Sequence, residues 1–256
     1  MPESDSKSEL DLYLQNGEVT MVRHPVRLQI LNILKREKEV PFPKILEETG
    51  LTKSTLSGFL NSLLDAGLIE RISSEKDGRR KIYRLSAKHI GIITPSSYSA
   101  ASEFRELIRK TYTNYDKINY RDMLPHIFRV ALAESGIRID PVLQRGGIIL
   151  GQSVAPFLVA DTLEKTVENI SDFWKRYEFG ELSLVSENPL RLDVKNCYEC
   201  MTLPSPIPGG CIISTGILSA LFSSFYGKEV TVTEIECICH GAPACRFEIN
   251  VQTTTE

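Results

Sequence analysis

The chain has 256 residues, of which 42% are hydrophobic and 25% are charged, and its formal net charge is −3. This length is sufficient for two domains, each with its own hydrophobic core. No apolar run approaches the roughly 20 residues that a membrane helix needs, and residues 1–17 are acidic and polar, unlike a signal peptide. We therefore expect a cytoplasmic protein without a membrane partner, and residues 1–20 are predicted to form a flexible or dimer-associated tail.

The charges are unevenly distributed along the chain. Residues 23–90 contain 14 basic and 8 acidic residues, a net charge of +6. Residues 91–256 contain 15 basic and 20 acidic residues, a net charge of −5. A basic segment of this kind is typical of a nucleic-acid-binding domain.

Residues 41–85 have the pattern of a helix, a tight turn, a second helix and a two-stranded wing. Gly50 marks the end of the first helix, and Thr52 or Ser54 is a suitable N-cap for the second. The second helix has a single apolar stripe, formed by Leu56, Phe59, Leu60, Leu63 and Leu64. Its other face is small and polar, which lets a recognition helix approach base edges and phosphates.

Ten residues of this segment are candidates for contact with DNA. They are Lys53, Ser54, Thr55, Ser57 and Asn61 in the helix, and Arg71, Lys76, Arg79, Arg80 and Lys81 in the wing. The cationic wing is suited to lie along a phosphate backbone. The alternative interpretation is a basic winged helix that binds only protein.

Three stretches, at residues 23–31, 51–57 and 65–69, resemble the winged-helix fold of the ArsR-type transcriptional regulators. This resemblance implies a winged helix-turn-helix domain over residues 21–88 that binds a double-stranded DNA operator. The family's usual metal-ligand cysteines are absent from the recognition helix, because no cysteine precedes Cys197. Sensing is therefore expected in the remainder of the chain.

The second half has the pattern of helices followed by strands. A linker is predicted at residues 89–101, where Pro95 and several serines interrupt the periodicity. Helices are predicted at residues 104–118, 121–135, 140–159, 162–177 and 211–226, and strands at 180–186, 190–195, 229–239 and 245–251. This order predicts an α+β sensor domain over residues 102–252 with a C-terminal antiparallel sheet.

All six cysteines lie in one part of this domain: Cys197, Cys200, Cys211, Cys237, Cys239 and Cys245. Such clustering in a reducing compartment indicates metal or redox chemistry rather than a static disulfide framework. One interpretation is reversible thiol–disulfide switching by all six. A second is a tetrahedral zinc site, with zinc as the cofactor, drawing its ligands from Cys197, Cys200, Cys237, Cys239 and Cys245. A third is burial of the thiols as small apolar groups.

The predicted elements give some of these thiols specific roles. Cys211 opens a helix, whose amides stabilise a thiolate, so it is expected to be acidic and the first thiol oxidised. Cys237 and Cys239 are expected on one face of a strand. Cys245 is expected opposite Cys239, close enough for a disulfide.

Residues 145–151 and 236–249 resemble the 4-vinyl-reductase domain family, an α+β module that senses small molecules or signals. The combination with an ArsR-like winged helix resembles the MsvR-type redox regulators of methanogenic archaea. That resemblance implies a DNA-binding homodimer controlled by cysteine oxidation.

We therefore predict a redox-responsive transcriptional repressor. The alternative is a regulator that senses a metal or a small ligand through its second domain. No catalytic residues are predicted, because Gly146, Gly147 and Gly151 fit neither a dinucleotide fingerprint nor a phosphate loop. Glycines at this helical spacing instead favour close helix packing.

Overall fold

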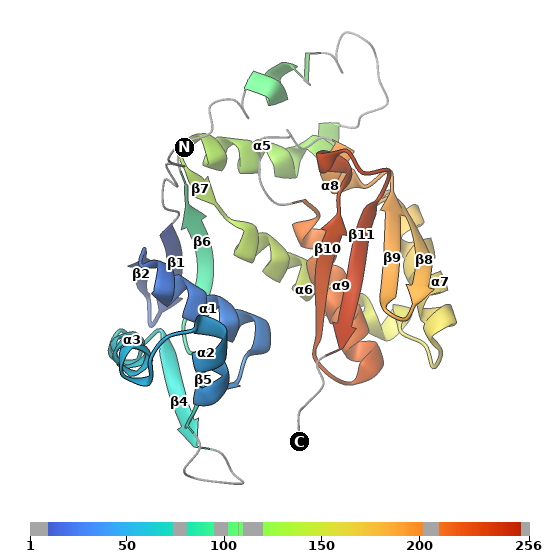
Figure 1. Ribbon diagram of the computed structural model, residues 1–256. Coiled ribbons are helices and arrows are strands. Elements are labelled where there is room, and N and C mark those ends of the chain that lie inside the picture. Colours follow the sequence, from blue (N-terminus) through green and yellow to red (C-terminus); the bar gives the residue numbers. More distant parts are fainter. Residues whose placement is uncertain are drawn as a thin grey trace, which may run out of the picture. The chain divides into compact units, whose positions relative to one another are not determined.

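A computed structural model of the chain describes residues 10–73, 81–94, 102–106, 108–109, 120–201 and 210–251 (Figure 1). The chain divides into two compact units, Met1–Pro95 and Ser96–Glu256. Within the described ranges, no single helix is long and apolar enough to cross a membrane, and one pair of helices passes that test only with a bend of 120° between them.

The first unit contains a winged helix made of three helices and a small antiparallel sheet. Its elements are α1 (Pro25–Glu37), β3 (Val40–Pro41), α2 (Phe42–Thr49), α3 (Lys53–Asp65), β4 (Ile69–Ser73) and β5 (Lys81–Leu85). In the sheet, β5 lies between β3 and β4. The predicted helix-turn-helix and wing are confirmed.

The turn between α2 and α3 follows from two residues. Gly50 ends α2 in the left-handed conformation, with φ of 64°, which glycine adopts without steric cost. The hydroxyl of Thr52 accepts a hydrogen bond from the backbone amide of Thr55 and so caps α3. The predicted apolar stripe faces the core: Leu56, Leu60 and Leu63 are buried, and Phe59 and Leu64 pack at its margin.

The described part of the predicted tail, from Leu10 onward, and the start of the predicted linker form strands. β1 (Leu10–Gln15) pairs with β2 (Glu18–Val22) on one side and with β6 (Lys88–Ile93) on the other, all antiparallel. The acidic and polar composition of the N-terminal segment suggested a flexible or dimer-associated tail. However, β1 obtains its second partner from residues more than 70 positions away, and local sequence patterns do not report such a pairing.

Asp11 anchors β1 to the winged helix through a buried ion pair. Its carboxylate lies 2.9 Å from the ammonium of Lys35 on α1, and the Tyr13 hydroxyl donates a hydrogen bond to it. Burial raises the pKa of Asp11, but hydrogen bonds from His89 and Lys35 outweigh this effect and bring the pKa to about 2. The strand is therefore part of the folded unit, because a buried charge is tolerated only with such partners.

The second unit is the predicted α+β domain. Its helices are α5 (Tyr120–Glu134), α6 (Asp140–Leu158), α7 (Leu163–Arg176), α8 (Tyr198–Met201) and α9 (Ile212–Tyr226), with a 3-10 turn η1 (Ile238–His240). Its strands are β7 (Ile137–Arg138), β8 (Glu181–Glu187), β9 (Leu190–Lys195), β10 (Val230–Glu236) and β11 (Cys245–Val251). The antiparallel sheet has the order β10-β11-β9-β8.

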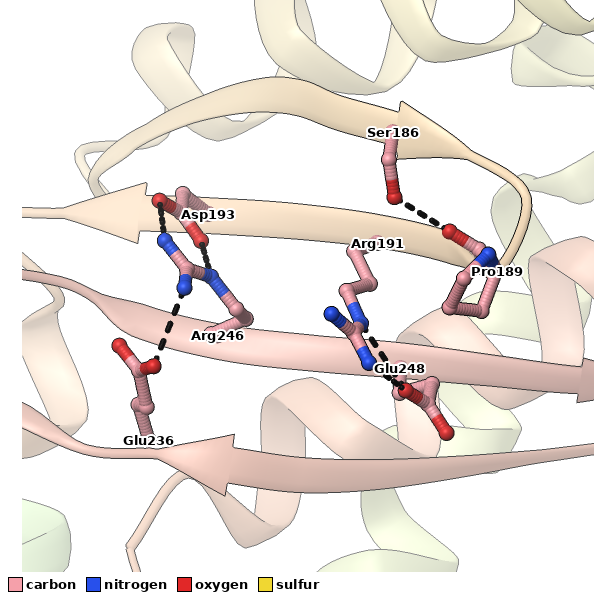
Figure 2. Close-up of polar contacts among 7 residues, drawn as sticks. All are labelled: Ser186, Pro189, Arg191, Asp193, Glu236, Arg246 and Glu248. Atoms are coloured by element: carbon pink, nitrogen blue, oxygen red, sulfur yellow. Dashed lines mark hydrogen bonds and ion pairs between the residues drawn. The ribbon is translucent and has the colours of Figure 1, made fainter.

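The two faces of this sheet have opposite character. The inward face of β11 carries Cys245, Phe247 and Ile249, all buried. On the other face, Arg246 pairs with Asp193 at 2.7 Å and with Glu236 at 3.0 Å, and a second cross-strand pair joins β9 to β11 (Figure 2). This alternation fixes the strand register, because a slip by one residue would bury the charges.

Helices α6 and α9 pack closely because glycines face one another. A Cβ on Gly147 would overlap the backbone oxygen of Ile213, and one on Gly151 would lie 2.6 Å from the backbone oxygen of Ile217. Gly216 of α9 similarly faces α6. The expectation that these glycines serve helix packing is confirmed for Gly147 and Gly151, whereas a Cβ on Gly146 would meet nothing within 4 Å.

We predict that Gly147→Ala lowers the free energy of unfolding by about 1–3 kcal/mol, because the added methyl group forces the two backbones apart. The control is Gly146→Ala, whose Cβ would meet nothing within 4 Å. This variant should be neutral or more stable by up to about 1 kcal/mol, as Ala replaces Gly within a helix. Urea unfolding followed by fluorescence of Trp174, the single and buried tryptophan, measures both. Equal effects of the two substitutions would contradict the close packing.

Candidate functional site

The exposed face of α3 presents small polar side chains. Ser54, Thr55 and Asn61 are exposed, and Lys53 is exposed at the first turn. Ser57 is partly exposed, and its hydroxyl donates a hydrogen bond to the backbone oxygen of Lys53. These are the five helix residues predicted from the sequence. Ser54 and Asn61 lie opposite the buried leucines of α3, whereas Lys53 is exposed because it begins the helix.

The wing is described only in part. Arg71 on β4 and Lys81 on β5 are exposed, whereas Lys76, Arg79 and Arg80 lie outside the described residues. Arg84 also belongs to β5, but its guanidinium pairs with Glu70 at 2.6 Å and with Glu39 at 3.4 Å. Arg71 and Lys81 are therefore the described wing cations best placed for phosphate contact.

The second candidate site is a cluster of five buried thiols, which we call the thiol cluster: Cys197, Cys200, Cys211, Cys237 and Cys245. The Sγ atom of Cys200 lies 3.3 Å from those of Cys211 and Cys237 and 3.4 Å from that of Cys245. The Sγ atoms of Cys197 and Cys211 are 3.2 Å apart. No member is more than 6% exposed.

Four separate segments bring these thiols together. Cys197 immediately precedes the short helix α8, and Cys200 lies within it. Cys211 precedes α9, and Cys237 follows β10. Cys245 begins β11, and α8 lies at the end of the sheet where β10 stops and β11 starts (Figure 1). The approach also needs a glycine before Cys211, because a Cβ on Gly210 would lie 2.7 Å from the Sγ of Cys237.

Three expectations about individual cysteines are corrected. Strand β10 ends at Glu236 and η1 follows, so Cys237 and Cys239 do not share a strand face. Of these two cysteines, Cys237 is the one that contacts Cys245, with 3.9 Å between the Sγ atoms. Cys211 precedes a helix, but contact with the thiols of Cys197 and Cys200 raises its pKa, and its side chain is fully buried. Its thiol is therefore not accessible to solvent.

Glu199, between the two cysteines of the CxxC sequence, was not identified from the sequence. Its buried carboxylate accepts hydrogen bonds from the backbone amides of Ile213 and Ser214, at 2.9 and 2.8 Å, and from the Ser214 hydroxyl. It thus caps the first turn of α9, where amides lack helical partners. Burial raises the pKa of Glu199 in spite of these hydrogen bonds.

Glu234 is a second acidic residue that the sequence analysis did not select. Its Oε2 atom accepts a hydrogen bond from the backbone amide of Cys211 at 3.1 Å, and its Oε1 atom is buried without a partner among the described residues. Burial raises the pKa of Glu234 to about 7. Neither carboxylate forms a recognisable motif with the cysteines, so only the folded structure reveals them.

The arrangement fits a metal ion. The ligand atoms of Cys200, Cys211, Glu234, Cys237 and Cys245 all lie within 4.8 Å of one another. Tetrahedral zinc with Zn–S bonds of about 2.3 Å places its sulfur ligands about 3.8 Å apart, close to the separations in the thiol cluster. The group includes three of the cysteines proposed from sequence as zinc ligands and adds Cys211 and Glu234.

Comparisons with known proteins identify both domains. Residues 190–251 match the family model of the vinyl-4-reductase domain, and residues 24–80 match that of the MarR family. The chain thus has a MarR-family winged-helix domain followed by a vinyl-4-reductase domain, which confirms the second resemblance drawn from the sequence. The N-terminal match is to the MarR family, not to the ArsR type suggested by the sequence motifs.

Individual relatives match only part of the chain. The uncharacterized protein MJ1642 of Methanocaldococcus jannaschii is 29% identical over 34% of this chain and 54% of its own length. The bacteriochlorophyll synthase 23 kDa chain of Cereibacter sphaeroides is 31% identical over 44% of this chain and 51% of its own length. A crystal structure of a vinyl-4-reductase family protein from M. jannaschii has a TM-score of 0.38 and 18% identity, covering 59% of this chain and 94% of that one. The chain spans about half the length of the first curated relatives that it matches.

We predict that Glu199→Ala lowers the free energy of unfolding of the second unit by about 1–3 kcal/mol, because buried amides of α9 lose their acceptor. Glu199→Gln should cost less, since its amide oxygen still accepts a hydrogen bond without a buried charge. Urea unfolding with Trp174 fluorescence measures both variants. If alanine and glutamine have the same effect, the capping role of the carboxyl oxygens is wrong.

Proposed function

We propose that this chain, which joins a MarR-family winged helix to a vinyl-4-reductase domain, is a transcriptional repressor whose DNA binding is controlled by oxidation of its thiol cluster. The observation that carries this proposal is the set of buried sulfur atoms 3.2–3.4 Å apart. They lie in the second unit, whereas the polar face of α3 lies in the first. One unit thus has groups suited to reading DNA, and the other has groups suited to responding to oxidants.

The DNA-binding part of the proposal rests on α3. Its polar side chains reach base edges, and the wing cations lie along phosphates. We propose a homodimer that places two copies of α3 in successive major grooves, so the operator is an inverted repeat with half-sites about 10 base pairs apart. Domain composition of this kind is that of a regulator rather than an enzyme.

The redox part of the proposal rests on the short sulfur–sulfur separations. A disulfide has an S–S distance of about 2.05 Å, so a pair such as Cys200 and Cys211 needs a shift of about 1 Å to form one. Two thiols then lose two protons and two electrons to an oxidant such as a hydroperoxide, which is reduced to an alcohol and water. Such a bond changes the free-energy difference between two conformations by about 2–4 kcal/mol. A change of this size shifts the populations of the two conformations substantially.

A second candidate function is metal-dependent regulation. It is favoured by the buried Oε1 atom of Glu234, which has no hydrogen-bond partner among the described residues and lies beside four buried thiols. Cys200, Cys211, Cys237 and Cys245 would hold a zinc ion, with Glu234 adjacent. Zinc at such a site supplies folding energy by linking its ligands. Here it would hold α8, the start of α9 and the ends of β10 and β11 together.

We predict different effects for helix and wing substitutions. Asn61→Ala should change the discrimination between operator sequences by about 1–3 kcal/mol, because a base-edge contact is lost. The double variant Arg71→Ala, Lys81→Ala should weaken binding to all sequences and reduce the salt dependence, by about one unit of slope for each lost phosphate contact. Fluorescence anisotropy over a salt series measures both, with Lys228→Ala in the second unit as the charge control. A wing variant with an unchanged salt slope would contradict phosphate contact.

We also predict that DNA affinity of the wild-type protein differs between reducing and peroxide-treated samples. Cys200→Ser and Cys211→Ser should bind DNA normally when reduced and lose most of this difference, because the closest sulfur pairs are removed. Retention of the full response in both variants would contradict a thiol switch in this cluster.

Metal analysis of anaerobically purified protein separates the two functions. About one zinc per chain, with unfolding of the second unit when a chelator removes it, favours the metal-dependent function. Metal-free protein with all six thiols titratable, together with a reversible response to peroxide and reductant, supports the redox function.

A further inference from the structure

Cys239 differs from the other cysteines in its access to solvent. It is partly exposed, whereas the five members of the thiol cluster are buried. Cys197, Cys211 and Cys245 have no exposed surface at all. An oxidant in solution must touch a sulfur atom to react with it, so burial protects the cluster and leaves Cys239 as the thiol within reach.

The turn that carries Cys239 is held firmly at the edge of the cluster. Within η1 and after it, the backbone amides of His240 and Ala242 both donate hydrogen bonds to the carbonyl oxygen of Cys237, at 3.0 and 3.1 Å. Gly241 closes the turn with φ of 89°, a conformation that favours glycine. The side chain of Cys239 packs on one side against the apolar group of Phe104, Met123, Val130 and Ala133.

Cys239 also contacts the segment that carries the CxxC sequence. Its Sγ atom lies 3.9 Å from the backbone oxygen of Cys200, as the donor of an S–H hydrogen bond. Its accessibility to solvent distinguishes it from the buried thiols of the cluster. Cys200 in turn touches three further thiols of the cluster, at 3.3–3.4 Å. Cys200 therefore links the partly exposed thiol to the buried ones.

We propose that Cys239 is the site at which a hydroperoxide first modifies this protein, and that Cys200 then forms a disulfide with it. The proposal deepens the redox function above and rests on it. It also replaces Cys211, the thiol expected from sequence to be oxidised first.

The chemistry proceeds in two balanced steps. The Cys239 thiol first releases its proton to solvent. Its sulfur then attacks one peroxide oxygen, so that an S–O bond forms, the O–O bond breaks, and the departing hydroxide or alkoxide takes up a proton from solvent. The Cys200 thiol then attacks the sulfenic sulfur, so that the S–S bond forms, the S–O bond breaks and water leaves. Two thiols are oxidised and one hydroperoxide is reduced.

This route explains how an exposed reaction reaches the buried cluster. When Cys200 bonds to Cys239, its sulfur must turn away from Cys211, Cys237 and Cys245. Because Glu199 next to it caps α9, the same movement strains the contact between α8 and α9. A modification at the surface is thus converted into a rearrangement of the core.

The test uses the full-length reduced protein under anaerobic conditions. A short pulse of N-ethylmaleimide is quenched, the protein is unfolded, the remaining thiols are blocked with an isotopically labelled reagent, and each cysteine is quantified by mass spectrometry. Cys239 should be modified at least about tenfold faster than any other cysteine, since a buried thiol reacts only after local opening. Faster modification of any other cysteine would overturn the proposal.

A peroxide arm tests the second step. One equivalent of hydrogen peroxide should give a Cys200–Cys239 disulfide as the first crosslinked peptide. Cys239→Ser should slow the loss of free thiols by about tenfold or more, whereas the control Ser153→Ala, at an exposed position of α6, should leave both the rate and the maleimide labelling of Cys239 unchanged. A different first disulfide, or a wild-type rate in Cys239→Ser, would refute the route.

The outcomes also separate this proposal from the wider function. Rapid labelling and crosslinking of Cys239 with no change in DNA affinity would support the modification site and contradict the regulatory function. A normal redox response of DNA binding in Cys239→Ser would support the function and contradict the site.

Discussion

The organisation of the second unit depends on the hydrogen bonds that the carboxylate of Glu199 accepts from the start of α9. This carboxylate joins α8, which carries Cys200, to the first turn of α9, which follows Cys211. Without an acceptor there, the amides at the start of a buried helix would lack partners. The same contact brings two cysteine-bearing segments together, so helix capping and thiol clustering have a single cause. The glycines of α6 and α9 then fix where α9 lies.

The chain separates its chemistry into two units of opposite charge. The basic N-terminal half presents short polar groups on α3, and a buried ion-pair centre at Asp11 joins β1 to the winged helix. The acidic second half concentrates its buried polar and nucleophilic groups at the end of one sheet. Its outer sheet face carries cross-strand ion pairs that keep the register of the cysteine-bearing strand β11.

Local periodicity predicted most helices and strands, because the repeat of a helix or strand alone determines which of its residues share a face, as for Leu56, Leu60 and Leu63. Strand β1 was not predicted from the sequence, because the residues that it buries are Asp11 and Tyr13, while its leucines are only partly buried. The arrangement of the thiols could not be predicted from the sequence for a related reason. The ladder between β10 and β11 shifts register between Glu234 and Glu236, and η1 replaces the end of the expected strand. Counting residues across the expected hairpin therefore placed Cys245 opposite Cys239, which is wrong. No spacing of residues in the sequence indicated Glu199 or Glu234.

The wide separation of the cluster's members along the chain has a consequence for biosynthesis. Cys200 and Cys245 are 45 positions apart, and β11 is the last described strand of the sheet in chain order. A ribosome adds about 5–20 residues per second, so the first cysteines leave it seconds before their last neighbour exists. During that interval nothing shields them from oxidants or stray metal ions. Burial of the first cysteines therefore depends on synthesis and folding of the last hairpin.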